Sequence, residues 1–165
     1  MLAPATASLW FFILTAPICL YVAYSDMSRM KIPNHAVLLT VLVYAVAGLI
    51  LLPFVDYAWR WLHLVVVLAV GFIMNMLGML GAGDAKYAAA MAPFVALGDL
   101  FNVMMLFAAI MLAAFVTHRL ARAIPPVRNL VPHWESWVRK DFPMGLALGG
   151  TLAAYLAMAA KYGVQ

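Results

Sequence analysis

Charged side chains are scarce in this sequence. Only 10% of its 165 residues are Asp, Glu, Lys or Arg, whereas 68% are hydrophobic and the mean hydropathy is +1.02. An average soluble domain carries about 25% charged residues. The composition therefore excludes a water-soluble globule. Six apolar stretches of about 20 residues would leave ~45 for every loop and both ends, so no separate soluble domain fits.

A second cysteine and a cluster of histidines are also missing. Cys19 is the single cysteine, and one thiol forms neither an internal disulfide nor a cysteine zinc site. There is no HExxH helix motif for a zinc protease and no GxSG motif for a serine nucleophile. We therefore expect no metal and no cofactor. The four histidines are scattered along the chain: His35, His63, His118 and His133.

Long apolar stretches dominate the chain and predict an all-α, polytopic membrane protein with about six transmembrane helices. The fourth stretch is short for a span and contains Pro93. The longest connection, 119–143, contains Pro125, Pro126 and Pro132, followed by an aromatic and basic segment that we expect to lie in the headgroup layer. The predicted spans are 7–24, 35–54, 61–80, 85–98, 100–118 and 144–160.

The basic residues fall mostly on one side of these six spans. Two of them, Arg60 and Lys161, lie on the other side. Because basic loops stay in the cytoplasm, we predict that both chain ends are outside, and we attribute the net charge of +4 to topology and not to nucleic-acid binding. The eight residues predicted to be cytoplasmic are Arg29, Lys31, Lys86, Arg119, Arg122, Arg128, Arg139 and Lys140.

Carboxylates next to membrane spans are functional candidates, because a charge there is costly to keep. The same topology places Asp26 and Asp84 together at the cytoplasmic boundary, with Glu135 and Asp141 in the long cytoplasmic loop. The remaining two acids lie at the opposite boundary. There, Asp56 is expected to be solvated and Asp99 to cap a helix.

Asp84 follows a tight reversal between the third and fourth spans. We expect Gly81 and Gly83 to supply unusual φ angles and close backbone approach in this turn. The N-terminus of the fourth helix would favour an ionised Asp84, whereas Asp26 near a helix C-terminus would be disfavoured as an ion. Arg29 and Lys31 oppose that second effect. The two carboxyls are thus predicted to be electrostatically unequal.

Two carboxyls held about 3 Å apart share one proton, since both cannot ionise easily. The ionised member can take a proton from a water that attacks a peptide carbonyl, while the protonated member supports the developing oxyanion. Such a pair hydrolyses a peptide without a metal or a covalent intermediate. The residues alone do not decide which of Asp26 and Asp84 is the base.

The combined pattern of these residues resembles a known family. Five residues, 27–31, separate Asp26 from Ile32-Pro33-Asn34. Gly81-Ala82-Gly83-Asp84 follows after the second and third predicted spans. This arrangement is similar to the type IV prepilin peptidases, which are GxGD membrane aspartic proteases. The similarity extends to Phe142-Pro143-Met144-Gly145 at the start of the last span.

The resemblance implies a single peptidase domain over 1–165 that cleaves the leader of type IV prepilins or pilin-like proteins at the cytoplasmic boundary of a bacterial inner membrane. Asp26 and Asp84 match the family's catalytic aspartates. The implied partners are a pilin-like substrate helix, the bilayer and pilus assembly machinery. Because the chain has no CxxC and no added cytoplasmic region, it looks like the short Flp or Tad form, without methyltransferase activity.

Supporting roles are expected for five residues around the two aspartates. Gly81 and Gly83 shape the turn, and Lys86 either tunes Asp84 or reaches the headgroups. Pro33 stops the helix after Asp26, and Asn34 is expected to cap the second span.

Three alternatives stay open at this stage. The chain could be another GxGD intramembrane protease, although the Pro-Ala-Leu motif expected there is missing. It could be an ion-coupled membrane protein using Asp26 and Asp84 as carriers, although such sites lie near mid-bilayer. It could also be a non-catalytic assembly factor with the same fold.

Overall fold

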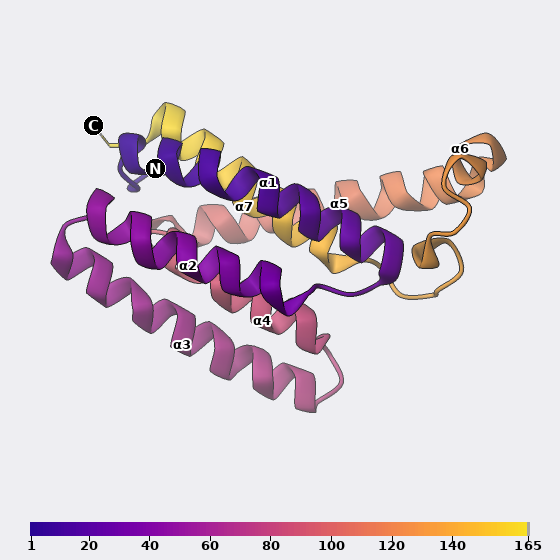
Figure 1. Cartoon of the computed structure of the whole chain (residues 1–165), viewed down its shortest axis with the longest axis horizontal. Coiled ribbons are helices and arrows are strands. Elements are labelled where there is room, and N and C mark those ends of the chain that lie inside the picture. The colour runs from indigo at the N-terminus through magenta and orange to yellow at the C-terminus, as the bar shows by residue number, and fades with distance from the viewer. Residues whose placement is uncertain (165) are drawn as a thin grey trace.

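The computed structural model describes residues 1–164, and these residues form helices joined by short turns (Figure 1). The prediction of an all-α polytopic membrane protein is confirmed. The α-helices are α1 (Ala5–Arg29), α2 (Asn34–Leu51), α3 (Phe54–Met76), α4 (Ala82–Met91), α5 (Leu100–Ala123), α6 (Pro125–Leu130) and α7 (Met144–Tyr162). Three 3-10 turns complete them: η1 (Ala92–Phe94), η2 (Leu97–Asp99) and η3 (Glu135–Trp137).

Five helices, α1, α2, α3, α5 and α7, are long and apolar enough to cross a membrane, α5 together with the η2 turn before it. The predicted fourth span, 85–98, is not one continuous helix. It consists of the end of the ten-residue α4 followed by η1 and η2. Pro93 explains the break, because proline lacks the N–H and clashes with the preceding turn inside a helix.

The chain ends show that this broken segment nevertheless traverses the bundle. The N–H of Ala5 donates to the carbonyl of Val164 at 2.8 Å, and the N–H of Val164 donates to Ala3 at 3.2 Å. The N- and C-terminal ends therefore meet at one end of the molecule (Figure 1). Since the two ends coincide, the number of passages is even, and 85–96 supplies the passage that the five long helices lack.

Close packing between α1 and α7 forms the centre of the bundle. A Cβ added at Gly149 would lie 2.9 Å from the carbonyl oxygen of Cys19, so the two backbones are in contact at this point. Small residues allow membrane helices to approach in this way. Helices α4 and α5 pack against α7, and α2 and α3 pack against α4. This arrangement brings the C-terminal end of α1 close to the N-terminal ends of α4 and α7.

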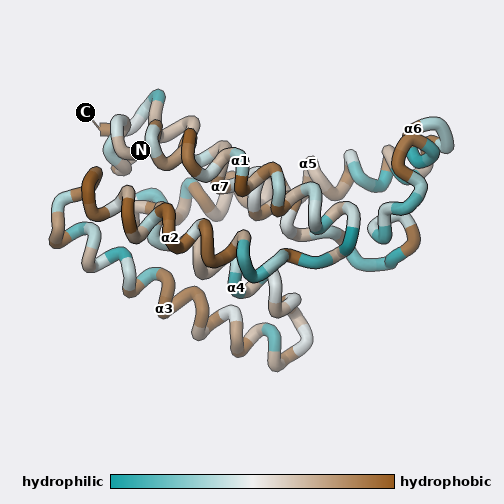
Figure 2. The backbone as a smooth tube through the Cα atoms, in the orientation of Figure 1, coloured by the Kyte–Doolittle hydropathy of each residue, from teal (hydrophilic) through white to brown (hydrophobic). Residues whose placement is uncertain are grey.

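The outer faces of α3 and α5 are apolar and exposed, which is what lipid contact requires. Figure 2 shows hydrophobic residues along most of the bundle, whereas hydrophilic positions gather near α6 and the loop that follows it. The end that carries α6 is the end at which α1 finishes (Figure 1). The fold therefore has one polar end, distinct from the end where the termini meet.

Asp99 has a different role from the predicted helix cap. It is 1% exposed, and its side chain makes no capping bond to α5. Its carboxylate instead accepts the N–H of Leu2 at 2.9 Å and the hydroxyl of Tyr155 at 3.0 Å. Asp99 thus ties the N-terminal segment and α7 to the start of α5.

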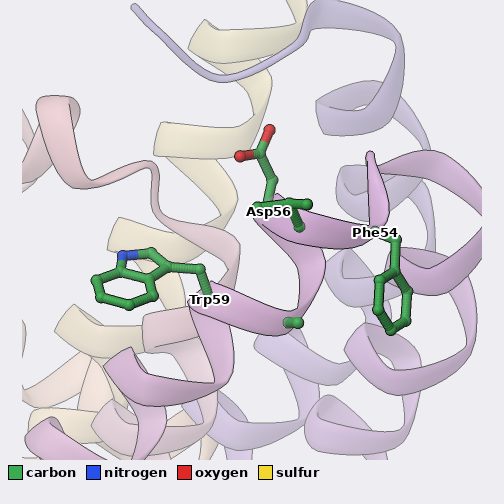
Figure 3. A pocket seen from close by; sticks show the side chains of 5 residues that line it. Phe54, Asp56 and Trp59 are labelled. Atoms are coloured by element: carbon green, nitrogen blue, oxygen red, sulfur yellow. The ribbon is translucent and has the colours of Figure 1, made fainter.

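Asp56 is exposed, as predicted, in the first turn of α3. It borders a shallow surface hollow with Phe54 and Trp59, and Figure 3 shows its carboxylate pointing away from both rings. This hollow lies at the start of α3, whereas the turn before Asp84 follows the end of α3. A 23-residue helix is roughly 34 Å long, so neither the hollow nor Asp56 belongs to the same site as Asp84.

Candidate active site

Asp26 lies in the last turn of α1 and is 5% exposed. The helix ends just beyond it, because Met30 adopts a left-handed conformation with φ of 52° and donates its N–H to the carbonyl of Asp26 at 2.8 Å. A left-handed residue at this position is a common way for a helix to end. The carboxylate is therefore buried at the polar end of the bundle, on a turn with fixed geometry.

The start of α7 supplies the hydrogen bond that holds this carboxylate. The N–H of Gly145 donates to Oδ2 of Asp26 at 2.6 Å. Gly145 is the second residue of α7, and the first N–H groups of a helix have no partner inside it. A Cβ at position 145 would lie 2.9 Å from the Cβ of Asp26, so glycine is required for this approach.

The sequence prediction missed this role of Gly145. The residue was expected to match the family pattern at the start of the last span, but not to contact an aspartate. A signal was present in the sequence. Pro143 predicts a helix start, and a glycine two residues later offers a free N–H without a side chain.

The turn before Asp84 uses a different glycine from those predicted. Gly78 has the positive φ of 72°, whereas Gly81 has an ordinary φ of −65°, and Gly83 does not adopt a positive φ either. The side chain of Asn75 donates to the carbonyl of Leu80 at 2.8 Å and closes the same turn. The expectation of unusual φ angles at Gly81 and Gly83 is therefore wrong, because among the glycines of this turn Gly78 is the one with a positive φ.

Gly81 and Gly83 serve close approach instead. Gly81 caps α4, and its N–H donates to the carboxylate of Asp84 three residues later, as in a capping box. A Cβ at Gly81 would lie 2.5 Å from Oδ2 of Asp84, so any side chain there would displace the carboxylate. A Cβ at Gly83 would lie 3.5 Å from the Cβ of Ile32, which is ordinary contact. This contact places the Asp84 turn beside the segment that follows Asp26.

Asp84 and Asp26 are near enough to interact electrostatically. The pKa of Asp84, which lies in the first turn of α4 ahead of the segment 85–96, is raised to about 6. Burial of the carboxyl is the largest cause, and the negative charge of Asp26 is the second. The Gly81 N–H acts in the opposite direction. The expectation that the start of the fourth helix favours an ionised Asp84 is therefore wrong, because burial and the charge of Asp26 outweigh the helix end. The structure thus brings the two predicted aspartates into one site.

The remaining supporting residues are arranged differently from expectation. Pro33 precedes α2 and accepts backbone bonds from its first turn, while Asn34 is already helical and makes no capping bond. The side chain of Asn34 instead accepts a hydrogen bond from Nζ of Lys86 at 3.5 Å. Lys86 therefore contacts the start of α2. The predicted cap at Asn34 is wrong, because Pro33 occupies the cap position.

A buried carboxylate held by a backbone N–H, beside a second carboxyl whose pKa is raised to about 6, is suited to acid and base catalysis on one water. Within residues 1–164, no group of three or more His, Cys, Asp or Glu side chains is arranged to bind a metal ion. The site is therefore best described as a pair of carboxyls at the polar end of the bundle.

Comparison with known proteins gives one finding of similarity. The model of the type IV leader peptidase family matches residues 13–118, a range that contains Asp26 and Asp84 and ends before Gly145. No curated protein matched the chain, and no solved structure matched it either. The match covers more than half of the sequence and agrees with the membrane fold. The chain therefore belongs to the type IV leader peptidase family.

Proposed function

We propose that this protein is an aspartic endopeptidase that removes the leader of type IV prepilins or pilin-like proteins, with Asp26 and Asp84 as its catalytic residues. One observation carries the proposal. Two aspartates that are far apart in the sequence meet at one end of the bundle, where the charge of Asp26 contributes to the raised pKa of Asp84. Family membership supports peptidase chemistry at this site.

The geometry favours different roles for the two carboxyls. Burial disfavours the charge of both carboxyls, and each accepts a backbone N–H, Asp26 from Gly145 at 2.6 Å and Asp84 from Gly81. The charge of Asp26 acts in addition on Asp84, whose pKa is raised to about 6, so Asp84 is the carboxyl that keeps the proton. In the proposed reaction, Asp26 takes a proton from water as the oxygen attacks the scissile carbonyl carbon, and Asp84 protonates the carbonyl oxygen. The C–N bond then breaks as Asp26 gives its proton to the leaving amine, and Asp84 takes a proton back from a hydroxyl of the tetrahedral intermediate, which restores the starting pair.

The proposed orientation places this site at the cytoplasmic boundary of a bacterial inner membrane. The long basic loop and α6 lie at the end of the bundle where α1 finishes (Figure 1), and Asp26 is in the last turn of α1. The positive-inside rule puts the cytoplasm at this basic end. A pilin-like substrate helix would lie in the bilayer beside the spans and present its leader junction to Asp26 and Asp84. Short members of this kind are expected to lack methyltransferase activity.

Incubation with candidate prepilins tests the function directly. The purified protein in detergent should convert a prepilin to a shorter form, and mass spectrometry should locate the new N-terminus at the leader junction. The same assay on an ordinary signal-peptide remnant separates this function from that of another GxGD protease. Absence of any cleaved product from prepilins that have the leader junction would contradict the proposal.

The pH dependence should follow the proton on Asp84. Because an active pair needs one proton, and Asp84 loses its proton as the pH rises through its raised pKa of about 6, kcat/KM should decline above that pH. Initial rates measured from about pH 5 to about pH 8 would show this basic limb. The exposed Asp56→Asn variant should show the same limb. A rate that is flat across this range would contradict a shared proton.

A further inference from the structure

Two arginines on α5 hold the loop that leads into α7. Arg119 donates from its guanidinium to the carbonyl of Lys140 at 2.8 Å, and Arg122 donates to the carbonyl of Arg139 at 2.9 Å. The two arginines are three residues apart and therefore lie on one face of the helix. They bind two successive carbonyls, which fixes both the position and the direction of the backbone in residues 137–142.

Aromatic contacts on the same face of α5 hold the two ends of this segment. The buried ring of His118 stacks on Trp137, with 5.2 Å between ring centroids and an interplanar angle of 13°. It also meets Phe142 edge-on at 5.9 Å, and Phe142 contacts Phe115 at 5.7 Å. Aromatic pairs with these geometries are favourable beyond the area that they bury. The segment is thus attached to α5 along its whole length.

The attached segment continues directly into the residue that binds Asp26. Phe142 is followed by the buried Pro143, which caps α7, and Gly145 is the second residue of that helix. Only two residues, Pro143 and Met144, separate Phe142 with its aromatic contacts from Gly145 with its 2.6 Å hydrogen bond to Asp26. With the proline ring fixing φ at 143, this short connection leaves little freedom for the start of α7.

We propose that Arg119 and Arg122 are positioning residues for the peptidase reaction, which fix the start of α7 so that the N–H of Gly145 stays on the carboxylate of Asp26. The inference rests on the proposed function. It extends the site to the end of α5 and to the loop before α7, both of which lie outside the predicted set of site residues. Arg139 and Lys140 contribute their backbone carbonyls, so their side chains are not needed for this role.

The double variant Arg119→Ala/Arg122→Ala tests the proposal. Its kcat should fall about tenfold with KM changed by less than about twofold, because misplacement of a reacting group costs rate and leaves the substrate surface intact. Arg119→Lys/Arg122→Lys, which keeps a donor at each position, should recover part of the rate. The matched control is Arg128→Ala, which removes the same charge from an exposed position on α6 and should behave as wild type.

Hydrogen–deuterium exchange provides a readout that does not depend on cleavage. In the Arg119→Ala/Arg122→Ala protein, the peptide spanning 143–148 should exchange faster than in the wild type, while in Arg128→Ala it should not. If the double variant does not purify as a folded protein, Arg122→Ala alone serves the same measurements. Unchanged exchange together with unchanged kcat would overturn the positioning role. Inactivity of the wild type would overturn the proposed function, while the exchange result still tests the attachment of the loop.

Discussion

Replacing Asp84 with Asn is expected to lower kcat for prepilin cleavage by at least about 1000-fold, and Asp26→Asn should do the same. Asn has nearly the shape of Asp but cannot take up or release the proton in either proposed role. The pair acts as a unit, so the double variant should lose no more activity than either single variant. Single-turnover rates with a purified prepilin would measure all three.

The control for this prediction is Asp56→Asn, which removes a carboxylate at the other end of α3, where the side chain is exposed (Figure 3). This variant should keep the wild-type rate. All variants should still extract with the membrane and elute as a single species in detergent, because Asn preserves volume and hydrogen bonding. A fully active Asp84→Asn protein would rule out the proposed catalytic pair and leave a non-catalytic role within the family.

The placement of Asp26 and Asp84 at the same end of the bundle could be predicted from the sequence because it depends on parity, whereas their pairing was implied by the family resemblance. Hydropathy gives the number of passages, and parity then puts the end of the first span and the start of the fourth on one side. The excess of Lys and Arg on that side then predicts that it faces the cytoplasm. None of these steps requires knowledge of side-chain contacts.

The conformation of individual residues in the turns could not be predicted, because several residues in each turn can adopt the same backbone conformation or occupy the same cap position. Gly78, Gly81 and Gly83 all suit a reversal, and only the path of the backbone shows that Gly78 carries the positive φ of 72°. Likewise, Asn34 was a reasonable helix cap until the helix proved to start one residue earlier, with Pro33 at the cap position. Such choices differ by small free energies that local sequence does not resolve.

Gly145 and the face of α5 were missed for a different reason. Their roles arise from contacts across 119 residues in one case and about 20 in the other, and no periodicity encodes such pairs. From the sequence, Arg119 and Arg122 were interpreted only as cytoplasmic basic residues that set the membrane orientation. That assignment and the positioning role are compatible, because a guanidinium can carry the charge that sets orientation and still donate to a carbonyl.

Gly145→Ala should lower kcat by about 100-fold while leaving the protein folded. A methyl group at this position would lie 2.9 Å from the Cβ and 3.0 Å from Oδ2 of Asp26, so either α7 shifts or the carboxylate rotates. Both movements break the 2.6 Å hydrogen bond to Asp26. Steady-state kinetics would show the loss in kcat, and thermal unfolding in detergent would show whether the fold persists.

Gly150→Ala is the matched control on the same helix. Its added methyl would lie 3.3 Å from a methyl group of Ile110, and that side chain can move by a few tenths of an ångström. This variant should keep near wild-type activity. Combining Gly145→Ala with Arg119→Ala/Arg122→Ala gives the sharpest result, because changes that act through one hydrogen bond are not additive. The triple variant should be no slower than Gly145→Ala alone. A further tenfold loss would mean that the arginines act on the reaction by a separate route.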